Sequence, residues 1–128
     1  MNEMPKTVAT TLAPSAIGPY SQAVVAGGLV FVSGQLPIDP ATGEFADGGI
    51  EEHTHQCMKN IQAIAEAAGT RLDKAVKLCV YLSDMKNFGA VNQVYAEYFP
   101  DNPPARLALQ VAALPKNADI EIEAVLSL

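Results

Sequence analysis

Apolar and polar positions along the chain predict two amphipathic helices. Over residues 51–68, apolar side chains recur at steps of three and four residues, and Gly69 is expected to end this helix. A second helix is predicted over residues 85–98, capped by Ser83 and Asp84. Its inner side is expected to carry Phe88, Val91, Val94, Tyr95 and Tyr98.

Period-two alternation and short apolar runs predict the strands. Residues 75–82 alternate strictly, which places Val76, Leu78, Val80 and Leu82 on one face. Five further strands are predicted over residues 6–11, 20–26, 29–34, 105–111 and 119–127, and Gly27-Gly28 suits a tight hairpin turn.

The order β-β-β-α-β-α-β-β predicts one α+β domain over residues 1–128, with the helices stacked on one face of the sheet. The uncovered face must then contact water or another subunit. A chain of 128 residues accommodates a single domain with one modest core.

Composition and charge narrow the classes of partner. Eight basic residues are scattered among fourteen acidic ones, and the formal net charge is -6. Binding to the phosphates of nucleic acid, or to an anionic membrane surface, requires clustered Lys and Arg. We therefore expect neither nucleic acid nor membrane as a partner.

The cysteines and the N-terminal residues bear on the compartment. Cys57 and Cys79 lie singly in apolar stretches, not as a closely spaced pair. No leader-like segment opens the sequence, and no apolar run approaches the ~20 residues of a membrane span. These features predict a cytoplasmic protein with reduced thiols.

The last two predicted strands carry candidate site residues. Alternation puts Arg106, Ala108 and Gln110 on one face of the first, and Glu121 and Glu123 on one face of the second. A guanidinium grips a carboxylate through two parallel hydrogen bonds, and a glutamate orients or deprotonates a water. These residues could form a polar site on the sheet, although spacing alone favours a surface salt bridge between edge strands.

Hydroxyl groups flank two glycine turns. Tyr20 and Ser21 follow the rigid Gly18-Pro19 turn, and Ser33 precedes Gly34, whose backbone N–H can approach a ligand closely. Capping of hairpins by these hydroxyls is an equally good interpretation.

The sequence gives little support for a metal site or for a catalytic nucleophile. His53 and Cys57 share a helix face, but His55 points away, and zinc requires three or four convergent ligands. Solvated helix histidines explain this segment better, so we expect no metal. No nucleophile motif or phosphate-binding loop is present in the sequence.

Seven stretches, in this order and spacing, resemble the RidA family, also called the YjgF or L-PSP family, over nearly the whole chain. They are AIGPYSQA (16–23), VSGQLP (32–37), residues 56–69, VNQVY (91–95), PAR (104–106), VAALP (111–115) and IEIEA (120–124).

The resemblance implies a chorismate-mutase-like fold and a homotrimer whose sheets form a central barrel, with three clefts between subunits. It also implies an imine deaminase that hydrolyses 2-aminoacrylate, its imine tautomers and 2-iminobutanoate to 2-keto acids and ammonia. No metal or organic cofactor is implied.

The resemblance also assigns roles to individual residues. Arg106 matches the family's carboxylate-binding arginine, and Glu121 matches the carboxylate that positions water. Tyr20, Ser33 and Asn92 match further cleft residues, with Tyr20 expected to bound the pocket from across the interface. The backbone N–H of Gly34 or the Ser33 hydroxyl is expected to assist Arg106.

One position departs from the family pattern. Ala108 stands where the family often carries Cys, so a covalent step at that thiol is excluded, and the substrate preference stays open. Two alternatives to the deaminase remain. One is a non-catalytic protein that binds small carboxylates such as 2-ketobutyrate in the same cleft. The other is an endoribonuclease or translation inhibitor, which the net charge of -6 disfavours.

The single-layer sheet and a hydrophobic content of 49% predict a trimer in solution. Light scattering under native conditions should give about three times the mass of one chain. A monodisperse monomer would contradict both the trimer and the clefts between subunits.

Overall fold

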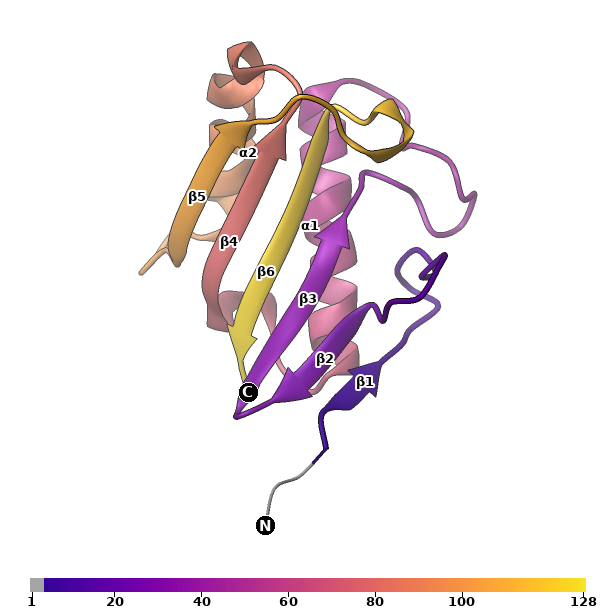
Figure 1. Cartoon of the computed structure of the whole chain (residues 1–128). Coiled ribbons are helices and arrows are strands. Elements are labelled where there is room, and N and C mark those ends of the chain that lie inside the picture. The colour runs from indigo at the N-terminus through magenta and orange to yellow at the C-terminus, as the bar shows by residue number, and fades with distance from the viewer. Residues whose placement is uncertain (1–3) are drawn as a thin grey trace.

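The computed structural model describes residues 4–128 as one mixed sheet with two long helices on one face (Figure 1). The elements are β1 (Lys6–Val8), β2 (Ala23–Ala26), β3 (Leu29–Gln35), α1 (Ile50–Ala67), β4 (Ala75–Leu82), α2 (Phe88–Tyr98), β5 (Ala105–Gln110) and β6 (Ile120–Ser127). This order confirms the predicted α+β class. Short 3-10 turns precede β4, α2 and β6.

The sheet order is β1-β2-β3-β6-β4-β5, so the strand that comes last along the chain lies near the centre. β6 runs antiparallel to both β3 and β4. β4 and β5 are parallel, and α2 makes the crossover that such a pair requires. β5 is left as one edge of the sheet.

The core lies between the sheet and the helices. On β6, Ile120, Ile122 and Leu126 are fully buried, and they alternate with side chains that are only half-buried. They pack in one cluster with the buried face of α1, including Met58 and Ile61. Burial of each such side chain contributes about 1.5–3 kcal/mol, so this layer supplies most of the driving force for folding.

Two turns follow the predicted glycine chemistry. Gly27 and Gly28 both have positive φ, 61° and 78°, as a tight two-residue hairpin between β2 and β3 requires. Gly69 has φ 89° directly after the C-cap of α1. Both predictions are confirmed.

The structure corrects the prediction for Val76, which is 48% exposed and not on the buried face of β4. The pairing of β4 with β6 shifts register between Ala75 and Lys77. Val76 lies at this bulge, so its side chain does not follow the in-and-out alternation of the strand. The first two strands are also shorter than predicted, because residues 9–22 form an irregular segment.

The face of the sheet opposite the helices is partly apolar and open. Phe31 on β3 and Leu107 on β5 are 45% and 41% exposed there. Among the described residues, no helix is long and apolar enough to cross a bilayer.

Candidate functional site

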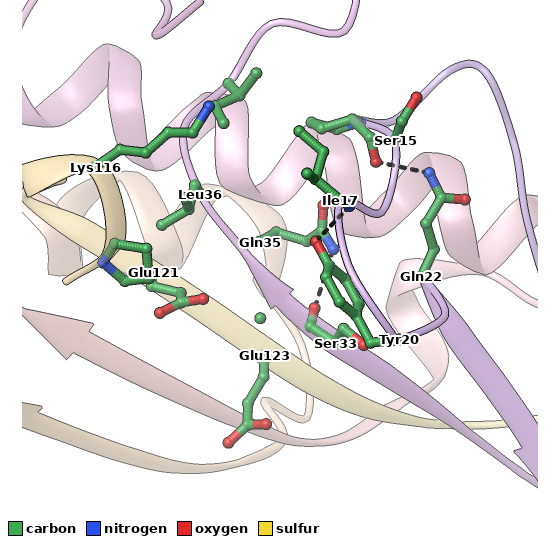
Figure 2. Close-up of a pocket in the computed structure, with 14 residues that line it drawn as sticks. Ser15, Ile17, Tyr20, Gln22, Ser33, Gln35, Leu36, Lys116, Glu121 and Glu123 are labelled. Carbon is green, nitrogen blue, oxygen red and sulfur yellow. Dashed lines mark hydrogen bonds between the residues drawn. The ribbon is translucent and has the colours of Figure 1, made fainter. Parts of the chain in front are cut away.

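A cavity of about 650 Å³ opens between β3, β6 and the irregular segment before β2 (Figure 2). Its lining includes Tyr20, Ser33, Gly34, Glu121 and Glu123. Four of the residues that match the family's site therefore meet in one place, together with Glu123, which the alternation already put on the same face as Glu121.

A bulge in β3 forms the floor of this cavity. The pairing of β3 with β6 is regular up to Val32 and resumes at Gln35, so Ser33 and Gly34 lie outside the regular ladder. The Ser33 hydroxyl donates a hydrogen bond to the carbonyl oxygen of Ser21, 2.6 Å away. Its proton is thereby engaged, which leaves the Ser33 oxygen free to accept.

Gly34 provides the space that the Glu121 carboxylate occupies. A Cβ built on Gly34 would lie 2.9 Å from the carboxyl carbon of Glu121 and closer still to one of its oxygens. The φ of Gly34 does not lie in the left-handed region, so the requirement for glycine here comes from this close approach. The sequence prediction used Gly34 only for its backbone N–H.

Glu121 is half-buried, and its surroundings favour the protonated form. Burial, and then repulsion from the neighbouring Glu123 carboxylate, raise the pKa of Glu121 above its ordinary value. A carboxyl group with a raised pKa exchanges protons more readily near neutral pH, which suits a group that both takes and returns a proton.

A buried glutamine holds the wall of the cavity. The side-chain oxygen of Gln22 accepts from the backbone N–H of Thr10 at 2.6 Å, and its nitrogen donates to the carbonyl of Pro14 at 2.8 Å. These bonds fix the segment that carries Tyr20, whose hydroxyl accepts from the backbone N–H of Ile17 at 3.4 Å. Sequence reasoning missed Gln22, because its partners lie eight and twelve residues away.

Arg106 lies elsewhere, at the edge strand β5. It is paired in register with the buried Leu78, so its side chain projects toward the helices. One guanidinium nitrogen donates to Asn92 of α2 at 2.6 Å. The guanidinium carbon is 4.8 Å from the centre of the Tyr95 ring and 5.2 Å from that of Phe88. These contacts hold the guanidinium in place although it is exposed.

The structure therefore divides the predicted site into two parts. Arg106 and Asn92 lie on the helix side of the sheet, while Glu121 lies on the opposite face, in register with Tyr81. The expectation that Arg106 and Glu121 have neighbouring strand faces within one chain is wrong. The alternative, a salt bridge between these strands, is also absent from residues 4–128, where the ion pairs involve other residues.

The histidines differ from the solvated side chains expected. The Nδ1 of His53 lies 2.8 Å from Asp119, and its Nε2 lies 2.9 Å from the carbonyl oxygen of Ala46, so this side chain ties α1 to the start of β6. His55 contacts the Tyr98 hydroxyl at 2.6 Å. Within residues 4–128, no three His, Cys, Asp or Glu side chains are grouped to hold a metal ion.

Comparison with known proteins identifies the class of protein. Residues 10–127 match the profile of the family described as Endoribonuclease L-PSP. The chain belongs to this family, which is the RidA family expected from its sequence motifs.

The matches to individual relatives span most of this chain and most of each relative. A RutC family protein of Sinorhizobium fredii is 55% identical over 125 residues, which span 98% of this chain and 99% of the relative. A Mus musculus protein named 2-iminobutanoate/2-iminopropanoate deaminase is 48% identical over 94% of this chain and 89% of its own. The crystal structure of E. coli TdcF with bound serine has a TM-score of 0.91 and 38% identity, covering 96% of this chain and 98% of that one.

The close approach of Gly34 and Glu121 leads to a prediction. The Gly34→Ala variant should fold with little change in Tm, because the flexible end of the Glu121 side chain can move away from the added methyl group. A crystal structure of the variant should show the carboxylate displaced from its position over residue 34.

Gly89→Ala is the matched control, because no atom lies within 4 Å of a Cβ built at this helical position. It should be neutral or stabilising by about 0.4–1 kcal/mol. An unmoved Glu121 carboxylate in Gly34→Ala would contradict the explanation offered for this glycine.

Proposed function

We propose that this protein is a 2-iminobutanoate/2-iminopropanoate deaminase, which hydrolyses reactive imines of short 2-amino acids to 2-keto acids and ammonia. The observation that carries the proposal is the pair of preformed half-sites: a held guanidinium at Arg106 and a cavity carboxyl group at Glu121. The name of the mouse relative, 48% identical, supports this reaction class. A cytoplasmic location stays a prediction.

Arg106 is suited to bind the substrate carboxylate. A guanidinium has five N–H donors in a planar fork, and the hydrogen bond to Asn92 engages one nitrogen. The aromatic rings of Phe88 and Tyr95 support its plane, so little side-chain entropy is lost when a carboxylate binds. Bidentate binding would fix both the position and the orientation of a small 2-imino acid.

A homotrimer is the proposed means of joining the two half-sites. Because Arg106 lies at an edge strand and Glu121 on the open sheet face, a neighbouring subunit is needed to bring them to one substrate. The exposed Phe31 and Leu107 give this open face the apolar area that an interface needs. Each active site would then combine Arg106 and Asn92 of one subunit with Tyr20, Ser33, Gly34 and Glu121 of another.

The reaction needs mainly positioning, because a protonated imine carbon is already electrophilic. Glu121 takes a proton from the attacking water as its oxygen bonds to that carbon. The nitrogen of the resulting tetrahedral adduct then receives that proton from Glu121. Ammonia leaves as the adduct's hydroxyl group gives its own proton to the Glu121 carboxylate and the carbonyl forms. The net change is addition of water and loss of ammonia, with no redox step and no cofactor. The backbone N–H of Gly34 is proposed to assist in holding the substrate.

A carboxylate-binding protein without catalysis is the second candidate. The serine bound to E. coli TdcF favours it, since serine offers the same carboxylate that Arg106 would grip. Glu121 favours catalysis, because a receptor for 2-keto acids, which carry no ammonium group, gains nothing from a carboxyl group in the cavity. The family name refers to an endoribonuclease, but the cavity is lined by two glutamates and one lysine, which is unsuited to phosphate.

The experiment that tests this function generates 2-iminobutanoate with a threonine dehydratase and follows release of 2-ketobutyrate. The parent should accelerate release. Arg106→Lys should lose most of the activity and Arg106→Ala nearly all, because Lys keeps the charge but lacks the planar fork. Glu121→Gln should bind 2-ketobutyrate almost normally while turnover falls roughly 10²–10⁴-fold. Full activity of Glu121→Gln would place water activation elsewhere.

A mixing experiment tests the shared site. Arg106→Ala and Glu121→Gln are each expected to be inactive, but subunits of the two variants, dissociated together and reassembled, should form some intact sites. A random 1:1 mixture should recover about one quarter of the parent activity, since each site takes one residue from each of two subunits. A mixture that remains inactive, although mass spectrometry shows mixed trimers, would mean that one chain supplies both residues.

A further inference from the structure

Glu121 has a second carboxylate beside it that the proposed mechanism does not use. Glu123 lies two residues further along β6, so both side chains project from the same face of the strand and line the same cavity (Figure 2). The alternation predicted this shared face from sequence, but it gave Glu123 no task.

The two glutamates differ in their hydrogen bonds. Tyr81 on β4 is in register with Glu121, yet its hydroxyl donates to Oε1 of Glu123 at 2.5 Å. A phenol has only one proton to donate, so this donor serves Glu123 and not Glu121. This hydrogen bond is also the main cause of the raised pKa of Tyr81.

We propose that Glu123, held in place by Tyr81, is a positioning residue that makes Glu121 the proton carrier of the pair. Two carboxylates on one strand face repel each other when both are ionised, and one of them gains from holding a proton. The hydrogen bond from Tyr81 distinguishes the two: Glu123 is the carboxylate held by a donor, and Glu121 takes and returns the proton. In other enzymes, surroundings that make the pKa values of two neighbouring carboxyl groups differ determine which acts as acid and which as base.

Other charged and titratable groups face the pair, and the test must take them into account. On β4, Cys79 is in register with Glu123, and Lys77 lines a smaller cavity with it. Tyr20 and Lys116 line the main cavity from the adjoining loops. Among residues 4–128, neither lysine forms an ion pair with Glu121 or Glu123.

The test measures the titration of the Glu121 carboxyl group directly, without substrate. The protein is prepared with ¹³C-labelled glutamate. The resonance of the Glu121 carboxyl carbon is the one that disappears in Glu121→Gln. In Glu123→Gln, the midpoint of the Glu121 titration should move to lower pH, because one cause of its raised pKa is removed. Tyr81→Phe should move it in the same direction by a smaller amount, because the Glu123 side chain is still present but is no longer held beside Glu121 by the hydrogen bond.

Glu66→Gln is the matched control. It makes the same change of charge at an exposed position of α1, on the other side of the sheet, and should leave the Glu121 midpoint unchanged. If the midpoint stays in place, or rises, in both Glu123→Gln and Tyr81→Phe, the inference is overturned. Tyr81→Phe keeps the aromatic ring, so it provides the test even if Glu123→Gln does not fold.

The activity measurement rests on the proposed function and separates its failure from that of the inference. Turnover should fall as pH decreases through the pKa of Glu121, because the mechanism starts from the ionised form, and this limb should move to lower pH in Glu123→Gln. A shifted NMR midpoint without such a limb would support the link between the glutamates and contradict the deaminase mechanism. In the proposed trimer, the Arg106 guanidinium of a neighbouring subunit would lower the pKa of Glu121, against the effect of Glu123. The titration is therefore repeated in Arg106→Ala.

Discussion

The alternation of β6 between core and cavity is the constraint on which the structure depends. Ile120 and Ile122 enter the core, and Glu121 and Glu123 enter the cavity, within four consecutive residues. A slip of one residue would bury both carboxylates and expose both isoleucines, at a cost far above the net stability of a small domain. Because β3 and β4 pair with β6 on either side, the register that fills the core also places Glu121.

Periodic segments of the fold could be predicted from sequence, and irregular ones could not. The strand over residues 75–82 and the course of the first helix were predicted to within a residue, since each buries one continuous apolar stripe. Val76 broke the pattern because a bulge depends on the partner strand, which the local sequence does not report. The segment held by Gln22 likewise depends on hydrogen bonds across many residues.

In the candidate site, too, features of a single strand could be predicted from sequence, and features that depend on strand pairing could not. Period-two alternation states correctly that Glu121 and Glu123 share a face, because that is a property of one strand. Whether Arg106 shares that face depends on the registers of β5 with β4 and of β4 with β6, and those registers put it on the other side. The close approach of Gly34 to Glu121 is also a contact between strands. Residue types and motifs thus identified the participants, while the pairing of the strands determined which of them meet.

The central position of β6 in the sheet affects how the protein folds during its synthesis on the ribosome. β1 to β3 and the β4–β5 pair are synthesised first, and each of these two halves keeps an unpaired strand edge until residues 120–127 have left the exit tunnel. Neither half can close its core before then, so the sheet is completed only after residues 120–127 have emerged. During that interval the unpaired edges of β3 and β4 are open to pairing with strands of other chains.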